Sequence, residues 1–220
     1  IAQILNLLYN IVDRGNIARI PDTGTGAVGA VGVCFPVIVI ITAFSNLFGT
    51  GGAPLFSIAR GSGDPDRARR ILHTCYTLLT GCALVLMAVG LLFARPILAL
   101  FGASDNAMQY ALPYMVIYLL GTLPSMLTTG LNPFVNAQGY VMVGMSSVVI
   151  GAVANLVLDP LFIFAFGMGV AGAAAATVLS QVLSAVFLLG FLHRRAEYRV
   201  RLLPLRDLLA GLALIRDIVS

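Results

Sequence analysis

The stretch ILHTCYTLLTGCALVLMAVGLLF, residues 71–93, decides the fold class of this chain, because it contains no charged side chain from end to end. A helix needs about 20 mostly apolar residues to cross the hydrocarbon core of a bilayer. This stretch is long enough, and arginines flank it, with Arg70 before it and Arg95 after it. It therefore predicts a transmembrane helix.

The composition of the whole chain supports the same class. Of the 220 residues, 59% are hydrophobic and 10% are charged, and the mean hydropathy is +0.97. An ordinary soluble domain carries about 25% charged residues. A soluble fold could not bury so much apolar surface, so we expect an all-α, polytopic membrane protein. The chain begins with Ile1, and we expect it to be a piece of a longer protein.

Similar apolar runs on both sides of this stretch predict six transmembrane helices in total. The predicted spans lie at about 1–17, 27–58, 71–93, 110–134, 140–166 and 170–192. Prolines in these runs predict kinks, which a membrane helix tolerates where its neighbours satisfy the freed carbonyl groups. We expect residues 1–195 to form one six-helix domain and residues 196–220 to form a basic, amphipathic cytoplasmic linker.

The arginines predict the orientation of the chain and its surroundings. All 13 basic residues are arginine, and ten of them lie between the second and third spans or after the sixth. Because positive residues favour the cytoplasmic side, both ends of this chain are predicted to be cytoplasmic, in a cell membrane. The arginines form short clusters between apolar runs, so the net charge of +4 predicts contact with lipid headgroups and not with nucleic acid.

Asp159 is the most unusual residue inside a predicted span, because an ionisable group in hydrocarbon costs about 3 kcal/mol. Asn155 lies four residues earlier and therefore on the same helical face. The two oxygens could bind Na⁺, or the carboxyl group could hold a proton, since burial favours its neutral form. The alternative is that Asp159 caps the helix break at Pro160 near the membrane surface. The residue pattern alone leaves both interpretations open.

Other polar side chains within or beside the spans have more ordinary interpretations. Asp13 is followed by Arg14, which favours a solvated ion pair at the end of the first span. Polar residues inside a span usually join helices by hydrogen bonds. Those of interest here are Tyr114, Asn132, Thr177 and Gln181.

Small residues on single faces predict close contacts between helices. They are Gly26, Gly29 and Gly32 in the second span, and Gly172, Ala173 and Ala176 in the sixth. No Ser–His–Asp, HExxH or P-loop pattern occurs, and the three cysteines lack a metal-ligand spacing. The chain is therefore not expected to be an enzyme or to hold a cofactor.

Several segments together resemble a known family. They are LYNIVDR, VGVCFPV, GTGGAPLFSIARGSGD, FGAS, GLNPFVNAQG and, most specifically, AVANLVLDPLFIFAFGMGVAGAAAATVLSQ. In these segments the chain resembles the N-terminal lobe of a multidrug and toxic compound extrusion (MATE) transporter. The resemblance implies one of two six-helix lobes in a twelve-helix protein that opens alternately to each side. Such proteins export cationic or amphipathic organic compounds in exchange for Na⁺ or H⁺.

The resemblance also implies a site. The family's N-lobe cation site has an Asp in the first helix, an Asn and an Asp four residues apart in the fifth, and a Thr in the sixth. The matching residues are Asp13, Asn155, Asp159 and Thr177. We expect the substrate cavity to be lined by Tyr114, Asn132 and Gln181. The partners implied are membrane lipids, an organic substrate and the second lobe, with Na⁺ or H⁺ as the coupling ion.

Two rival functions remain open at this stage. A flippase for lipid-linked precursors, from the same superfamily, would use a similar lobe but would be expected to line its cavity with arginines. Here the arginines avoid the centres of the spans. A six-helix scaffold without transport activity would use its buried polar residues only to join helices.

Overall fold

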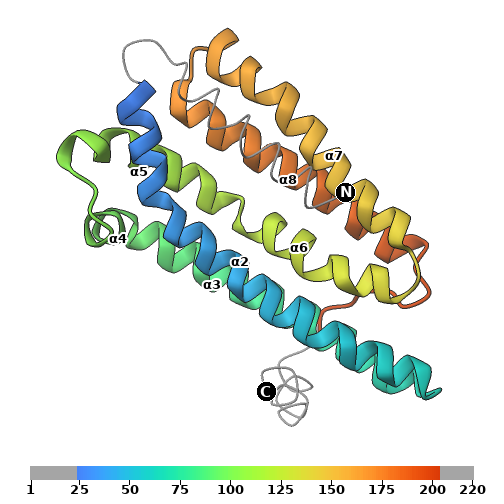
Figure 1. Ribbon diagram of the computed structural model, residues 1–220. Coiled ribbons are helices and arrows are strands. Elements are labelled where there is room, and N and C mark those ends of the chain that lie inside the picture. Colours follow the sequence, from blue (N-terminus) through green and yellow to red (C-terminus); the bar gives the residue numbers. More distant parts are fainter. Residues whose placement is uncertain (1–23, 204–220) are drawn as a thin grey trace.

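The computed structural model describes residues 24–203 and arranges its long helices in three layers (Figure 1). The helices are, in order, α2 (Gly24–Gly61), α3 (Pro65–Leu92), α4 (Ala94–Leu100), α5 (Asp105–Leu120), α6 (Thr122–Ala137), α7 (Val141–Pro160), the π-helical turn η1 (Leu161–Ala165) and α8 (Gly169–Arg194). The α5–α6 layer lies between the α2–α3 layer and the α7–α8 layer. Residues 24–203 contain no strand, which confirms the predicted all-α class.

Four helical segments in the described range are long and apolar enough to cross a membrane: α2, α3, α7 with η1, and α8. A fifth crossing results if α5 and α6 are taken as one bent span. The described residues therefore have the helices of a multi-pass membrane protein. The predicted span 1–17 lies outside the described residues.

The turn between α2 and α3 follows from its sequence, Gly63-Asp64-Pro65. Gly63 has a φ of 75°, a left-handed conformation that glycine adopts without a Cβ clash. The Asp64 side chain then accepts a 2.9 Å hydrogen bond from the backbone N–H of Arg67, which caps α3. Pro65 at the first helical position loses no hydrogen bond there. The α2–α3 hairpin is thus set by local residues.

The predicted span 110–134 forms two helices, α5 and α6, which meet at a bend of 54° after Leu120. Pro124 explains the position of the bend, because it has no N–H to donate to the carbonyl of Leu120 in a continuous helix. Gly121 also lies against α8, where a Cβ atom would come within 2.6 Å of Val178 Cγ2. The chain therefore turns at Gly121, one helical turn before the proline.

The layers approach each other most closely at glycines. A Cβ atom on Gly49 of α2 would lie 2.7 Å from the carbonyl oxygen of Gly130 on α6. A Cβ atom on Gly52, one turn further on, would lie 2.7 Å from Phe134 Cζ of α6. Small residues at such positions allow tight backbone packing, a main source of helix association in membranes.

Residues 196–203, which follow α8, lie across one end of the helices, and we call them the strap. Its side chains alternate: Ala196, Tyr198 and Val200 are buried, whereas Arg199 and Arg201 are exposed. This period of two is typical of an extended segment with one face packed. The strap therefore packs as part of the described fold.

Polar contacts fasten the strap to three helices. Arg60 of α2 forms a 2.8 Å ion pair with Glu197. The backbone N–H of Tyr198 donates to Gln138 Oε1, just after α6, at 3.0 Å. On α3, His73 Nε2 lies 3.0 Å from the Arg199 carbonyl oxygen, and Thr77 Oγ1 accepts from the Leu203 N–H at 3.0 Å. The strap thus joins the ends of helices that are far apart in the sequence.

Candidate functional site

Asn155, Asp159 and Thr177 form one hydrogen-bonded cluster between α7 and α8. The Asn155 Nδ2 group donates to Asp159 Oδ1 at 3.2 Å and to Thr177 Oγ1 at 3.3 Å. All three residues are buried, and Asp159 has 0% relative exposure. The structure therefore brings together three of the four residues predicted for the cation site. Asp13, the fourth, lies outside the described residues.

The chain around Asp159 shows why these residues meet. Pro160 ends α7 directly after Asp159, and the π-helical turn η1 follows. A Cβ atom on Gly172 would lie 2.8 Å from the backbone carbonyl of Phe162, so η1 and α8 are in backbone contact there. This close approach puts Thr177, just over one turn further along α8, opposite Asn155. Gly172 therefore lies at a close contact between helices, as its small-residue pattern predicted.

The cluster borders a cavity of about 590 Å³ that is lined by residues of α2, α5, α6, α7 and α8. Asn155, Thr177 and Gln181 are among its lining residues. Gln181 is informative because its Oε1 atom is buried and accepts no hydrogen bond from a described residue. A buried acceptor without a donor is costly, and rotation of this side chain would present the oxygen to a donor group on a molecule in the cavity.

Most of the other polar lining residues carry hydroxyl or amide groups. These are Thr42, Asn46, Ser125, Thr128, Thr129, Ser180 and Ser184. They were not predicted from the sequence, because each could equally be a polar residue that joins two helices by a hydrogen bond. The signal was their spacing, since Thr42 and Asn46, and Ser180 and Ser184, repeat every four residues and so share helix faces. Among the described residues, the lining contains no charged side chain.

Tyr114 and Asn132 have different surroundings from those predicted. Tyr114 is buried and stacks on Tyr118, with ring centroids 6.1 Å apart, and it is Tyr118 that lines the cavity. Asn132 Nδ2 joins α6 to α7 by donating to the Gly144 carbonyl at 2.9 Å and to Ser147 Oγ at 3.2 Å. Neither residue is among those lining the cavity, so their predicted contact with substrate stays a prediction.

The donor atoms of the cluster suit a hard monovalent cation. A carboxylate, an amide and a hydroxyl supply oxygen ligands, the kind preferred by hard cations. In the described part of the chain no three His, Cys, Asp or Glu residues group as a transition-metal site would require. The Asn155 NH₂ group now points at both neighbouring oxygens. A half-turn of this amide would present its oxygen to a cation between Asp159 and Thr177.

Comparison with a family model decides the relationship. The model described as MatE matches residues 1–161, which is most of the chain and includes Asn155 and Asp159. The chain belongs to the MatE family. The MatE assignment confirms the resemblance noted from the sequence, and relatives named as exporters and transporters agree with the expectation that this chain is not an enzyme.

The relatives of this MatE chain are about twice its length. Multidrug export protein MepA of Staphylococcus aureus strain MRSA252 is 27% identical over 199 residues, which cover 90% of this chain and 43% of MepA. The solved outward-facing structure of a multidrug resistance MATE transporter of the MOP superfamily has 26% identity and a TM-score of 0.87, over 99% of this chain and 48% of that one. The MatE chain thus corresponds to one lobe.

A second solved structure has the opposite conformation. The inward-facing form of a multidrug resistance MATE transporter is 28% identical, with a TM-score of 0.84 over 96% of this chain and 47% of that one. The MatE lobe therefore resembles lobes from both states about equally.

Replacing Thr177 by Val should test how the MatE cluster is held together. The change keeps the side-chain shape but removes the acceptor of the Asn155 hydrogen bond. We expect a loss of about 0.6–1 kcal/mol in the free energy of unfolding, measured by thermal unfolding in detergent. Thr128→Val is the control, because this cavity-lining hydroxyl donates within its own helix, to the Pro124 carbonyl. If the two variants lost the same amount of unfolding free energy, the hydrogen bond from Asn155 to Thr177 would have no special role in holding the cluster together.

Proposed function

We propose that this chain is one lobe of a cation-coupled antiporter that exports organic, often cationic, compounds by alternating access. The observation that carries the proposal is the buried Asn155–Asp159–Thr177 cluster at the wall of the 590 Å³ cavity. A carboxyl group with 0% exposure inside a membrane lobe has a high desolvation cost. Binding and release of a cation or proton is a function that accounts for this cost.

The coupling step assigned to the cluster is the uptake of Na⁺ or H⁺ by Asp159, together with Asp13. The family resemblance implies that Asp13 lies close to Asp159, where two carboxylates would repel one another and either ion would relieve the repulsion. Asn155 and Thr177 supply the remaining oxygens. Ion uptake then favours release of the exported compound, because the two ligands favour different states of the lobe.

Alternating access is supported by the likeness of this lobe to both outward-facing and inward-facing structures, with TM-scores of 0.87 and 0.84. A lobe that keeps its fold in both states can move as a rigid body against a second lobe. We propose that the second lobe belongs to the same polypeptide, and that the arginine-rich ends of α2, α3 and α8 face the cytoplasm of a cell membrane.

The cavity lining favours an organic substrate. Phe35 and Tyr118 provide aromatic surface, and Gln181 Oε1 provides an acceptor for an N–H group. Aromatic faces and acceptor oxygens together attract organic cations. The lack of arginine among the described lining residues disfavours the flippase alternative, which would need to bind a polyanionic headgroup.

The experiment that tests the proposal is transport by the full-length protein in proteoliposomes. An imposed Na⁺ or proton gradient is expected to drive movement of a fluorescent organic cation against its own gradient. Collapse of the gradient with an ionophore should stop that movement. If neither gradient drives transport, and if neither Na⁺ nor pH shifts the melting temperature, the scaffold alternative is correct.

A further inference from the structure

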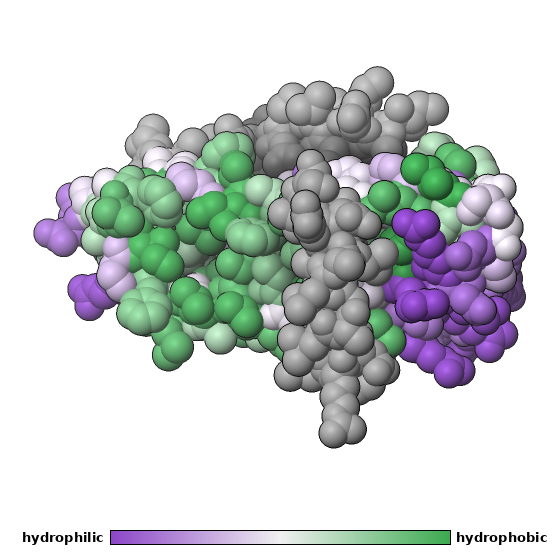
Figure 2. Space-filling view, turned by 90° about the horizontal axis from the view of Figure 1, so that it is seen from below, coloured by the Kyte–Doolittle hydropathy of each residue, from purple (hydrophilic) through white to green (hydrophobic). Residues whose placement is uncertain are grey.

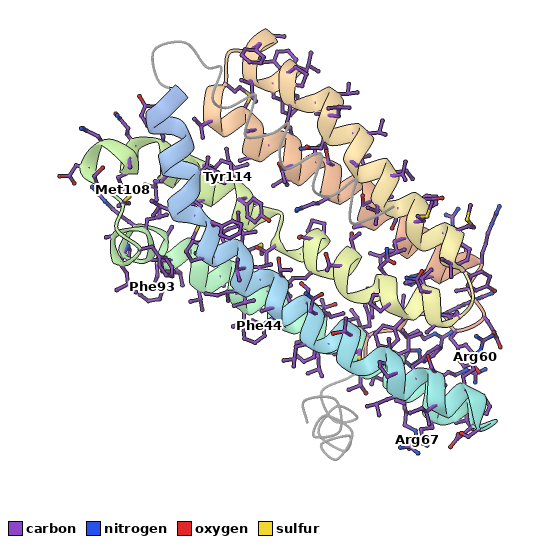
Figure 3. All side chains as sticks on the ribbon, in the orientation of Figure 1. Phe44, Arg60, Arg67, Phe93, Met108 and Tyr114 are labelled. Atoms are coloured by element: carbon purple, nitrogen blue, oxygen red, sulfur yellow. The ribbon has the colours of Figure 1, made fainter. Side chains whose placement is uncertain are left out.

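The arginine-rich end of the molecule carries more positive charge than its own carboxylates neutralise. In the described range it contains Arg60, Arg67, Arg69, Arg70, Arg194, Arg195, Arg199 and Arg201. Figure 3 shows Arg60 and Arg67 at this end, far from Phe93 and Met108 at the other. The carboxylates at this end, within residues 24–203, are Asp64, Asp66 and Glu197.

Each of these carboxylates already has an internal partner. Glu197 pairs with Arg60 at 2.8 Å, and Asp66 lies 3.7 Å from Arg69. Asp64 accepts the backbone N–H that caps α3. The remaining six arginines are exposed and form no ion pair with a described residue. Within residues 24–203 their guanidinium groups are therefore available to bind anions.

The strap adds two of these arginines, Arg199 and Arg201, to the surface that carries Arg70 on α3. On α3, Arg70 lies one turn before His73, and Thr77 lies one turn after it, so the three share a helix face. The strap runs along this face, with the Arg199 carbonyl at His73 and the Leu203 N–H at Thr77. Because Tyr198 and Val200 point inward, Arg199 and Arg201 point outward, about 7 Å apart along the extended backbone.

The surroundings of this surface are those of a bilayer boundary. Exposed apolar side chains lie in the same regions, including Ile58 at 66% and Leu202 at 58% relative exposure. Figure 2 shows hydrophilic residues gathered at this end, directly beside an apolar surface. The ends of membrane-spanning helices lie at the depth of lipid phosphates. Guanidinium groups bind phosphate with two parallel hydrogen bonds.

We propose that Arg70, Arg199 and Arg201 form a binding site for the headgroup of an anionic phospholipid, built jointly by α3 and the strap. The apolar neighbours receive the acyl chains, and the arginines receive the phosphate. This assignment does not depend on export, because it concerns the arginine-rich end and not the cavity.

The test is native mass spectrometry of the full-length protein in detergent, titrated with phosphatidylglycerol or phosphatidylcholine. Phosphatidylglycerol should bind more tightly, and the triple change Arg70→Gln, Arg199→Gln, Arg201→Gln should weaken it by about tenfold or more. Arg95→Gln is the matched control, since Arg95 is exposed on α4 outside this end and should leave the affinity unchanged. The corresponding triple change to Lys keeps the charge and should retain most of the preference.

Three results would overturn the site. If phosphatidylglycerol and phosphatidylcholine bound equally tightly, the arginines would not select an anionic headgroup. If Arg95→Gln lost as much affinity for phosphatidylglycerol as the triple Gln variant, overall charge and not this site would explain the binding. If soluble glycerol phosphate bound as tightly as phosphatidylglycerol, the ligand would be a free phosphate compound and not a lipid. The melting temperature of the triple Gln variant without added lipid should be unchanged, which would show that the variant is folded and that its loss of affinity is a loss of binding.

Discussion

Replacing Asp159 by Asn is expected to reduce gradient-driven export by the full-length protein by about 5-fold to 150-fold, the usual range for a lost coupling energy. The substitution removes a charge and keeps the size and shape of the side chain. The Asn155 Nδ2 group donates to Asp159 Oδ1, and an asparagine at position 159 offers an oxygen in the same place. The variant should therefore fold while losing the group that takes up Na⁺ or H⁺.

The melting temperature gives an independent measure of the same change. Wild-type protein should be stabilised by Na⁺ or by lowered pH, because an ion that binds only the folded state raises its stability. Asp159→Asn should lose this response, and Asp159→Glu should recover part of it. Asp105→Asn serves as the control, since Asp105 is an exposed carboxylate at the start of α5. Export at the wild-type rate by Asp159→Asn would disprove the coupling role.

Gly49→Ala is expected to destabilise the lobe by about 3 kcal/mol or more, at the upper end for overpacking. The new Cβ atom would lie 2.7 Å from the Gly130 carbonyl oxygen and 2.9 Å from its Cα atom. These are backbone atoms, so relief requires α2 and α6 to separate. Thermal unfolding should show a decrease in melting temperature of roughly 6–12 °C.

Gly81→Ala makes the same substitution in the interior of α3, where no neighbouring atom lies within 4 Å of the new Cβ atom. Alanine favours helix over glycine by up to about 1 kcal/mol, so this control should be neutral or stabilising. If both variants melted at the same temperature, the close approach of α2 and α6 would not limit the stability of the lobe.

The fold class was predictable because membrane helices must be long and apolar. Residues 71–93 lie almost entirely within α3, and the Gly63-Asp64-Pro65 turn has the local signals of a helix start. The prolines predicted kinks in the spans, but the position of the bend between α5 and α6 was not predicted. The run 110–134 contains Pro113, Pro124 and Pro133, and nothing in the sequence alone says which of them breaks the helix. The contact of Gly121 with α8 favours a bend near Pro124, and a contact between helices far apart in the sequence can be seen only in the folded structure.

The small-residue pattern of one span coincides with a close contact, and that of another has no such contact among the described residues. Gly172 does lie against the backbone of Phe162. Within residues 24–203, a Cβ atom on Gly29 or Gly32 would meet nothing within 4 Å, whereas the tightest backbone contact there involves Gly49 and Gly130. A glycine-rich face indicates that close packing is allowed, but the position of the neighbouring helix determines where it occurs.

The candidate site was predictable in part. The four-residue spacing of Asn155 and Asp159 indicated a shared face, and the family resemblance added Thr177 from another helix. The hydroxyl groups around the cavity were not predicted, since a serine in a membrane helix has the same sequence signature whether it faces a cavity or a carbonyl. Ser184 illustrates this, because it lines the cavity and also donates to the Ser147 carbonyl at 2.8 Å.

The strap has a practical consequence for dissecting the protein. A lobe produced on its own and cut after α8, near Arg195, would lose Tyr198 and Val200 from the packed interior and would remove one of the two edge-to-face partners of Phe56, the Tyr198 ring 5.3 Å away. A cut after Leu203 keeps these contacts and the hydrogen bond to Thr77. An end point at Leu203 therefore keeps every described contact of the strap, whereas one near Arg195 removes them.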